Sequence, residues 1–79
     1  MSAASLDQLD RLMSAAFFVG RQPRSEQYRQ GVRAILAHRL EAAPLPEVPF
    51  PIGTPEADAY FSGQDEGRDI ARREKGGTS

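Results

Sequence analysis

The stretch Pro44-Leu45-Pro46-Glu47-Val48-Pro49-Phe50-Pro51-Ile52-Gly53 divides the chain, because it holds four prolines in ten residues. Proline lacks a backbone N–H and fixes its own φ angle, so this stretch can be neither a helix nor an inner strand. The patterns on both sides of it are helical. Its apolar side chains are Leu45, Val48, Phe50 and Ile52. A free linker would be more polar, so we expect this stretch, the strap, to pack on a core between two helices.

With 79 residues, the chain has room for one domain whose core barely offsets the entropy of ordering the backbone. We expect a single helical domain over residues 1–75 and a disordered tail over residues 76–79. The chain has no cysteine and one histidine, so the sequence predicts no disulfide, no metal site and no cofactor. Self-association into a homo-oligomer, or a large partner, is the stabiliser that remains.

Charge is segregated along the chain, although the net charge is only −1. Residues 20–40 carry five arginines and one glutamate, whereas residues 41–69 carry seven acidic residues and one arginine. The two halves can therefore contact partners of opposite charge. No apolar run approaches the roughly 18 residues that a membrane span needs, and the N-terminus does not resemble a signal peptide, so we expect a cytoplasmic protein.

Apolar residues recur at steps of three and four from Leu6 to Phe17, which predicts a first helix over residues 5–19. The apolar stripe is expected to face the core. Alternatively, Leu12 and Phe18 are exposed and mark a surface for a partner.

A second helix is predicted over residues 24–42, with an apolar stripe that includes Tyr28. Gly31 lies beside Tyr28 and costs about 1 kcal/mol relative to alanine in a helix. That cost favours a close approach to the Gly31 backbone by another helix or by Phe50 of the strap.

Arg29 and Arg33 lie one turn apart on the second helix and project together. A solvated charged face is the simplest interpretation, and the alternative is a contact with phosphate groups or with an acidic protein surface. Aromatic residues do not alternate with these arginines in the sequence, so base stacking is not indicated. His38 has no second ligand one turn away and is expected to be a surface or hydrogen-bonded side chain rather than a metal ligand.

The third helix is predicted over residues 54–73, because Thr54 followed by proline is a favourable helix start. Tyr60, Gly63 and Gly67 fall on its buried side. The two glycines, four residues apart, leave a groove in which a neighbouring backbone can come close. The predicted fold class is thus all-α, with three short helices and the strap packed between the second and the third.

The exposed side of the third helix is acidic, with Asp58, Asp65, Glu66 and Asp69. Catalysis needs a pocket that shifts the pKa of a carboxylate, and an amphipathic face provides none. The two main interpretations are a solvated face and a face that binds a basic cleft which normally holds nucleic acid. The chain also lacks a phosphate-binding glycine loop, a Ser–His–acid set with supporting context and a metal-ligand cluster, so we expect that it is not an enzyme.

Three features occur in order along residues 27–73: Tyr28-x-x-Gly31, the Pro49-Phe50 pair of the strap, and Tyr60-x-x-Gly63 followed by Glu66-Gly67. This segment resembles the ribosome modulation factor family, in which two helices flank a connector with a proline and an aromatic residue. The chain departs from that family at Gln64, where an aromatic residue is expected, and in its acidic second half. The resemblance implies the helix–strap–helix arrangement and, as an alternative function, ribosome or RNA binding.

The chain is also short, rich in alanine, arginine, glycine and proline, and separates its positive from its negative charge. In this it looks like accessory proteins of phages and mobile elements, among them the anti-CRISPR proteins. That likeness implies a non-catalytic inhibitor that blocks target DNA binding by a type I CRISPR surveillance complex. The expected partner is a large protein or nucleoprotein complex, with a CRISPR effector favoured and the ribosome second. The expected partner-binding residues are Asp58, Asp65, Glu66, Asp69, Arg29 and Arg33.

Overall fold

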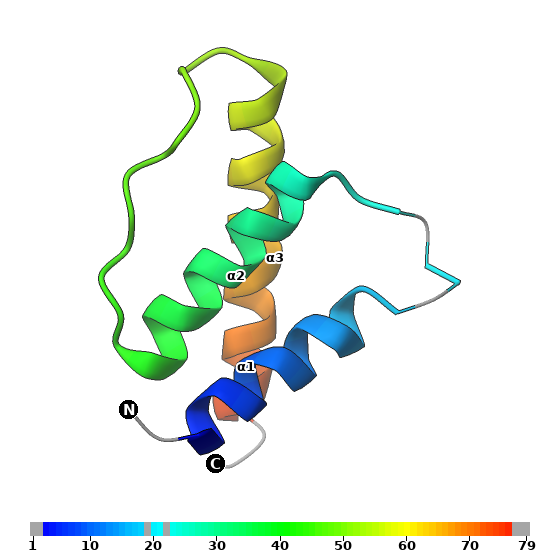
Figure 1. The fold of residues 1–79 in the computed structure, drawn as a ribbon, viewed down its shortest axis with the longest axis vertical. Coiled ribbons are helices and arrows are strands. Elements are labelled where there is room, and N and C mark those ends of the chain that lie inside the picture. The colour runs from blue at the N-terminus through cyan, green and yellow to red at the C-terminus, as the bar shows by residue number, and fades with distance from the viewer. Residues whose placement is uncertain (1–2, 19, 22, 77–79) are drawn as a thin grey trace.

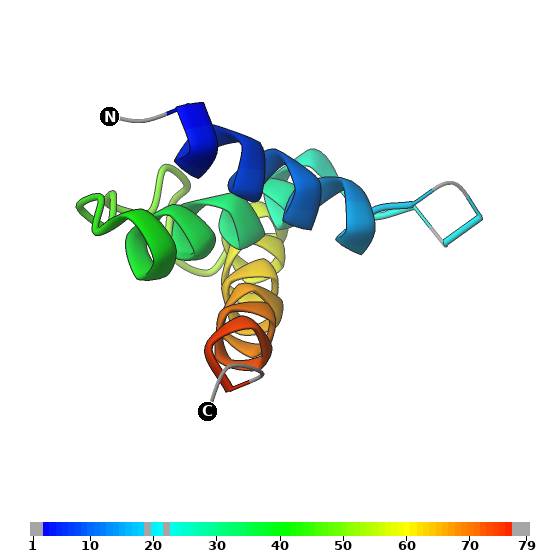
Figure 2. The same ribbon diagram turned by 90° about the horizontal axis from the view of Figure 1, so that it is seen from below.

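The computed structural model describes residues 3–18, 20–21 and 23–76, and these form three helices and no strand. The helices are α1 (Ala3–Ala16), α2 (Glu26–Glu41) and α3 (Pro55–Gly76). The predicted all-α class is therefore confirmed. Figure 1 shows α2 crossing the long α3, and Figure 2 shows α2 between α1 on one side and α3 on the other. None of the described helices combines the length and the apolar character that crossing a membrane requires.

The centre of the molecule is the contact between α2 and α3, which is built around glycines. Gly31 of α2 and Gly63 and Gly67 of α3 are all buried. A Cβ atom on Gly31 would overlap the carbonyl oxygen of Tyr60, and one on Gly63 would overlap that of Tyr28. The predicted role of these glycines in close backbone packing is confirmed. The Cα hydrogens that occupy those directions point at the two carbonyls, as in the Cα–H···O contacts of closely packed helices.

Apolar side chains surround this glycine contact. The buried apolar residues are Val32, Ile35 and Leu36 of α2, Ala57, Tyr60, Ile70 and Ala71 of α3, and Leu9 of α1. Leu9 joins a cluster with Val32, Leu36, Ile70 and Ala71, so α1 completes the core at the C-terminal half of α3.

Helix α2 is capped at its start by Ser25. The Ser25 side chain accepts a hydrogen bond from the backbone N–H of Tyr28 at 3.2 Å, which satisfies one of the free donors of the first turn. At the other end Ala42 has a φ of 58°, in the left-handed region, and closes the helix. The observed bounds lie within the predicted residues 24–42.

Helix α3 is capped by Thr54, whose hydroxyl accepts from the N–H of Ala57 at 3.2 Å and donates to the Pro51 carbonyl at 2.7 Å. One side chain thus starts the helix and fixes the end of the strap. Helix α3 continues to Gly76, three residues beyond the predicted end. Of the predicted tail, Gly76 is helical, and residues 77–79 lie outside the described residues.

Helix α1 ends at Ala16, earlier than the predicted residues 5–19, although residue 19 itself lies outside the described residues. The Arg21 guanidinium donates a hydrogen bond to the Ala16 carbonyl, which is one of the acceptors left free at a helix C-terminus. The chain then turns, with the N–H of Arg21 bonded to the Phe18 carbonyl at 3.1 Å and Gly20 at a φ of 104°. The side chain that ends α1 therefore comes from beyond the helix.

The strap packs on the core through part of its length only. Phe50 is half-buried, and its ring meets that of Tyr60 edge-on with centroids 5.9 Å apart. Val48 is also half-buried, but Ile52 is 78 % exposed and Leu45 is 44 % exposed. The expectation that all four apolar side chains lie on the core is wrong for Leu45 and Ile52. Between the strap and α2 lies an open groove of about 420 Å³ that Pro49 helps to line, so the strap borders α2 without filling that space.

Candidate interaction surfaces

Three acidic residues of α3 form a row on the side of the helix that faces away from α2. At 3.6 residues per turn, Asp58, Asp65 and Asp69 fall within about 40° of one another and about 180° from Gly67 at the centre of the packed side. All three are exposed. Their side chains are therefore free of any packing role in the core.

Phe61 interrupts this row with an apolar side chain that is 39 % exposed. It lies three residues after Asp58 and four before Asp65, so it is a direct neighbour of both carboxylates on the helix surface. Its ring meets that of Tyr60 edge-on at 6.4 Å. We call Asp58, Phe61, Asp65 and Asp69 the acidic face.

Two arginines partly neutralise the negative charge at the C-terminal half of the acidic face. Arg68 donates to Asp65 at 2.8 Å, and Arg72 donates to Asp69. Both are exposed pairs within one turn of helix, and such pairs stabilise a helix by only about 0.3–0.5 kcal/mol. Because no arginine or lysine occurs between Pro55 and Gly67, the negative charge is concentrated around Asp58.

Glu66 differs from the other acidic residues of α3, because its carboxylate is held inside the molecule. Arg21 donates to both carboxylate oxygens, at 2.9 and 3.0 Å, and the Tyr28 hydroxyl donates to Oε1 at 2.5 Å. The side chains of Glu66 and Arg21 are only about a fifth exposed. Glu66 therefore does not lie on the exposed side of α3 as expected: it joins α3 to α2 and to the α1–α2 connection. Its expected role in binding a partner stays a prediction.

The electrostatics of this cluster follow from its geometry. The hydrogen bond from Arg21 lowers the pKa of Glu66 below its ordinary value, against the opposing effect of burial, and the hydrogen bond from Tyr28 lowers it further. Burial, followed by the hydrogen bond to Glu66, raises the pKa of Tyr28 above its ordinary value. Both shifts keep Glu66 ionised and Tyr28 protonated at neutral pH.

Arg29 and Arg33 are both exposed, as predicted, but they do not act as one pair in the structure. Arg29 donates to Glu26 at 2.8 Å, whereas Arg33 reaches Asp10 of α1 at 3.5 Å. They also line different hollows, Arg29 beside the α1–α2 connection and Arg33 beside the strap. A joint arginine contact with a partner therefore stays a prediction.

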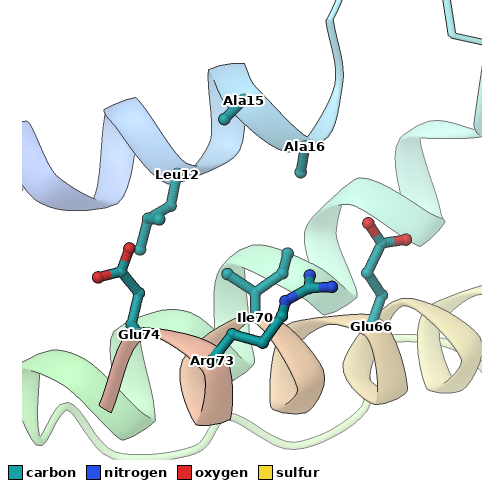
Figure 3. Close-up of a pocket in the computed structure, with 7 residues that line it drawn as sticks. All are labelled: Leu12, Ala15, Ala16, Glu66, Ile70, Arg73 and Glu74. Atoms are coloured by element: carbon teal, nitrogen blue, oxygen red, sulfur yellow. The ribbon is translucent and has the colours of Figure 1, made fainter. Parts of the chain in front are cut away.

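A groove of about 510 Å³ lies between α1 and α3. Figure 3 shows Leu12 of α1 pointing toward α3 beside Glu74, with Ile70 at the floor and Arg73 next to it. The rim carries charges of both signs, so the groove prefers neither an anion nor a cation. Among the described residues, no three His, Asp or Glu side chains are grouped as metal ligands.

Sequence reasoning missed two features of the site. Arg21 contacts Glu66 across 45 residues of chain, and no local pattern marks such a pair. Gln64 is 5 % exposed although it is polar. The spacing of residues 60, 64, 67 and 71 could have placed it on the buried side of α3.

No protein-family model, curated protein or solved structure matches this chain. Its candidate surfaces are therefore judged on their own residues and geometry.

Proposed function

We propose that this chain is a small non-catalytic interaction protein that binds a basic surface of a large nucleoprotein complex through its acidic face and thereby inhibits that complex. In this proposal the protein acts in the cytoplasm. The central observation is that Phe61 lies between Asp58 and Asp65 on the side of α3 that the core does not use.

The acidic face has the dimensions and chemistry to compete with nucleic acid for a basic surface. From Asp58 to Asp69 the row extends about 16 Å along α3, at a rise of 1.5 Å per residue. Carboxylates in a row can meet the arginines and lysines that otherwise contact phosphates. A rigid helix presents them at a low entropic cost, because their backbone is ordered before binding.

Phe61 favours a protein rather than a free cation or a small molecule as the target. Aromatic side chains at the centre of an interface, surrounded by polar groups, contribute much of the binding energy in protein complexes. An exposed aromatic ring flanked by two carboxylates fits a surface that has an apolar recess among basic residues. The expected target is therefore a basic protein surface within a nucleic-acid-binding machine.

The favoured target is the DNA-binding cleft of a type I CRISPR surveillance complex, and a ribosomal surface is the second choice. Both have basic protein surfaces that hold nucleic acid. Within the described chain, the carboxyl and phenol groups with shifted pKa values are Glu66 and Tyr28, and they are committed to each other and to Arg21. This commitment supports a non-catalytic role.

The test measures target DNA binding by a purified type I surveillance complex with and without this protein. The wild type is expected to abolish binding, and the double variant Asp58→Lys/Asp65→Lys is expected to lose at least tenfold in potency. The matched control is Glu47→Lys/Glu74→Lys, which changes the net charge equally at exposed residues outside the acidic face. Loss of potency in both double variants would contradict a role for the acidic face.

Affinity purification of the wild type from cells that carry a type I CRISPR system identifies the partner independently. Recovery of an effector subunit with the wild type and not with Asp58→Lys/Asp65→Lys supports the proposal. Recovery of ribosomal proteins in the same pattern would favour the second target. If neither assembly is recovered, the proposal is wrong.

A further inference from the structure

We infer that the hollow at the α1–α2 connection is a binding site for single-stranded nucleic acid. Its volume is about 270 Å³, and we call the residues that form it the arginine corner. These residues are Phe17, Phe18, Arg21, Arg24 and Arg29, with Gly20 and Pro23 between them. The residues of the arginine corner are not those of the acidic face, although Arg21 also lines a neighbouring hollow with Asp65 and Asp69. This inference goes beyond the proposed function.

The fold brings together aromatic and basic side chains that are spread over residues 17–29. The Arg21 guanidinium lies over the Phe17 ring at 5.0 Å, and that of Arg24 lies over the Tyr28 ring at 4.9 Å. The Phe17 and Tyr28 rings meet edge-on with centroids 6.2 Å apart. The Arg21 guanidinium is thus held by a ring that follows α1, and the Arg24 guanidinium is held by a ring on α2.

The charge of the arginine corner suits a phosphate group. Among the residues that the structure describes, no carboxylate lines the hollow, although Glu66 pairs with Arg21 and Glu26 pairs with Arg29. Arg21 is neutralised by its two hydrogen bonds to Glu66, so Arg24 and Arg29 supply the positive charge. The pair between Arg29 and Glu26 is largely exposed and can be exchanged for a phosphate at little cost.

Phe18 indicates that the ligand contains bases as well as phosphates. Its side chain is 56 % exposed and lines the hollow beside the arginines. Proteins that bind single strands combine basic residues along the backbone with aromatic rings on which unpaired bases stack. An acidic peptide without apolar residues would use the arginines and leave Phe18 in water, and a duplex would keep its bases out of reach.

The test is a fluorescence anisotropy titration of the full chain with a labelled single strand of about 12 nucleotides, within the usual site size. Binding is expected at low ionic strength. With two phosphates contacted, the logarithm of the binding constant should fall with the logarithm of salt concentration at a slope of about −1.4.

Variants distinguish base stacking on Phe18 from phosphate binding by Arg24 and Arg29. Phe18→Ala is expected to lower the affinity for the single strand about tenfold and to leave binding of inorganic polyphosphate unchanged. Arg24→Ala/Arg29→Ala should weaken both. The matched control is Arg39→Ala/Arg72→Ala, which removes two exposed arginines elsewhere and should change neither by more than about twofold. Far-UV circular dichroism confirms that each variant is folded.

The inference is wrong if the wild type shows no salt-dependent binding of the single strand, or if the control variant weakens binding as much as Arg24→Ala/Arg29→Ala does. Equal binding of duplex and single strand, with no effect of Phe18→Ala, would also overturn it. Asp58→Lys/Asp65→Lys should retain single-strand binding. If the acidic face proves not to bind a partner, single-strand binding at the arginine corner is still tested independently.

Discussion

Gly31 and Gly63 set the distance between α2 and α3, and this makes a direct prediction for alanine at either position. Alanine raises helix propensity by about 1 kcal/mol over glycine. Its Cβ, however, would overlap a backbone carbonyl that cannot turn aside, namely that of Tyr60 or of Tyr28. Overpacking of this kind typically costs 1–3 kcal/mol and more where the backbone must move.

We therefore expect Gly31→Ala and Gly63→Ala each to lower the free energy of unfolding by about 2 kcal/mol or more, as measured by urea denaturation. Ser62→Ala is the control, because Ser62 is an exposed position on the same helix. It should change stability by less than about 0.5 kcal/mol. A stabilising Gly31→Ala would mean that the two backbones are farther apart than described here.

Glu66 makes the stability of the fold depend on pH. Its pKa in the folded protein lies below the ordinary value of 4.5, so the ionised carboxylate stabilises the fold above that pH. The stabilisation is lost as the pH falls from about 4.5 through the lower folded-state pKa. Glu66→Gln removes it at every pH and should cost about 1–3 kcal/mol at neutral pH.

The measurement is urea denaturation of the wild type and Glu66→Gln from neutral pH down to about pH 3. The difference between them should be greatest above pH 4.5 and should shrink at the acid end. Asp58→Asn, an exposed carboxylate of the same helix, is the control and should differ little from the wild type throughout. A difference that grows on acidification would contradict the assigned role of Arg21 and Tyr28.

At the scale of elements, the strap is fixed at particular points rather than along its length. Phe50 meets Tyr60, and Thr54 bonds the Pro51 carbonyl, whereas Ile52 is 78 % exposed. Phe50→Ala should therefore cost about 1–2 kcal/mol, which is less than for a fully buried phenylalanine because the side chain is half-buried. Ile52→Ala should cost less than about 0.5 kcal/mol. Thermal unfolding of the two variants compares them, and equal losses would refute this division of the strap.

The starts of α2 and α3 could be predicted because their signals are local. Ser25 and Thr54 bond N–H groups only three residues away, so the sequence around each cap contains the whole interaction. The glycine contact was also predictable, since a glycine within a helix needs a compensating close approach. In contrast, α1 ends through a side chain of the following turn, and periodicity does not register Arg21.

The candidate surfaces were harder to predict than the helices. Helical spacing was enough to place Asp58, Asp65 and Asp69 on one side of α3. It also puts Glu66 on the flank of α3, about 80° from Asp58 and 100° from Gly67. It could not show that the Glu66 carboxylate is bound, because its partners lie 38 and 45 residues away. The arginine corner lies within residues 17–29, but helical periodicity does not reveal it, because its side chains meet at the connection between α1 and α2.

For the molecule as a whole, the three helices differ in how firmly they are held. The α2–α3 pair contains the glycine contact and most of the buried side chains. Of the α1 side chains that the structure describes, in residues 8–16, only Leu9 is buried, and a groove separates part of α1 from α3. Regions with few buried apolar contacts open locally at a lower free energy than the global unfolding.

Native-state hydrogen exchange should therefore show less protection for the amides of α1 than for those at the centre of α2 and α3, by at least about tenfold. The Arg21 side chain bonds the last carbonyl of α1, lies over Phe17 and is itself held by Glu66. Glu66→Gln should consequently lower the protection of α1 more than that of α2, after correction for the change in global stability. Gln8→Ala changes a half-buried position of α1 that does not contact Arg21 through any hydrogen bond given above, and it is the control for an unspecific loss of protection in α1. Uniform protection of all three helices in the wild type would show instead that α1 unfolds only together with the α2–α3 pair.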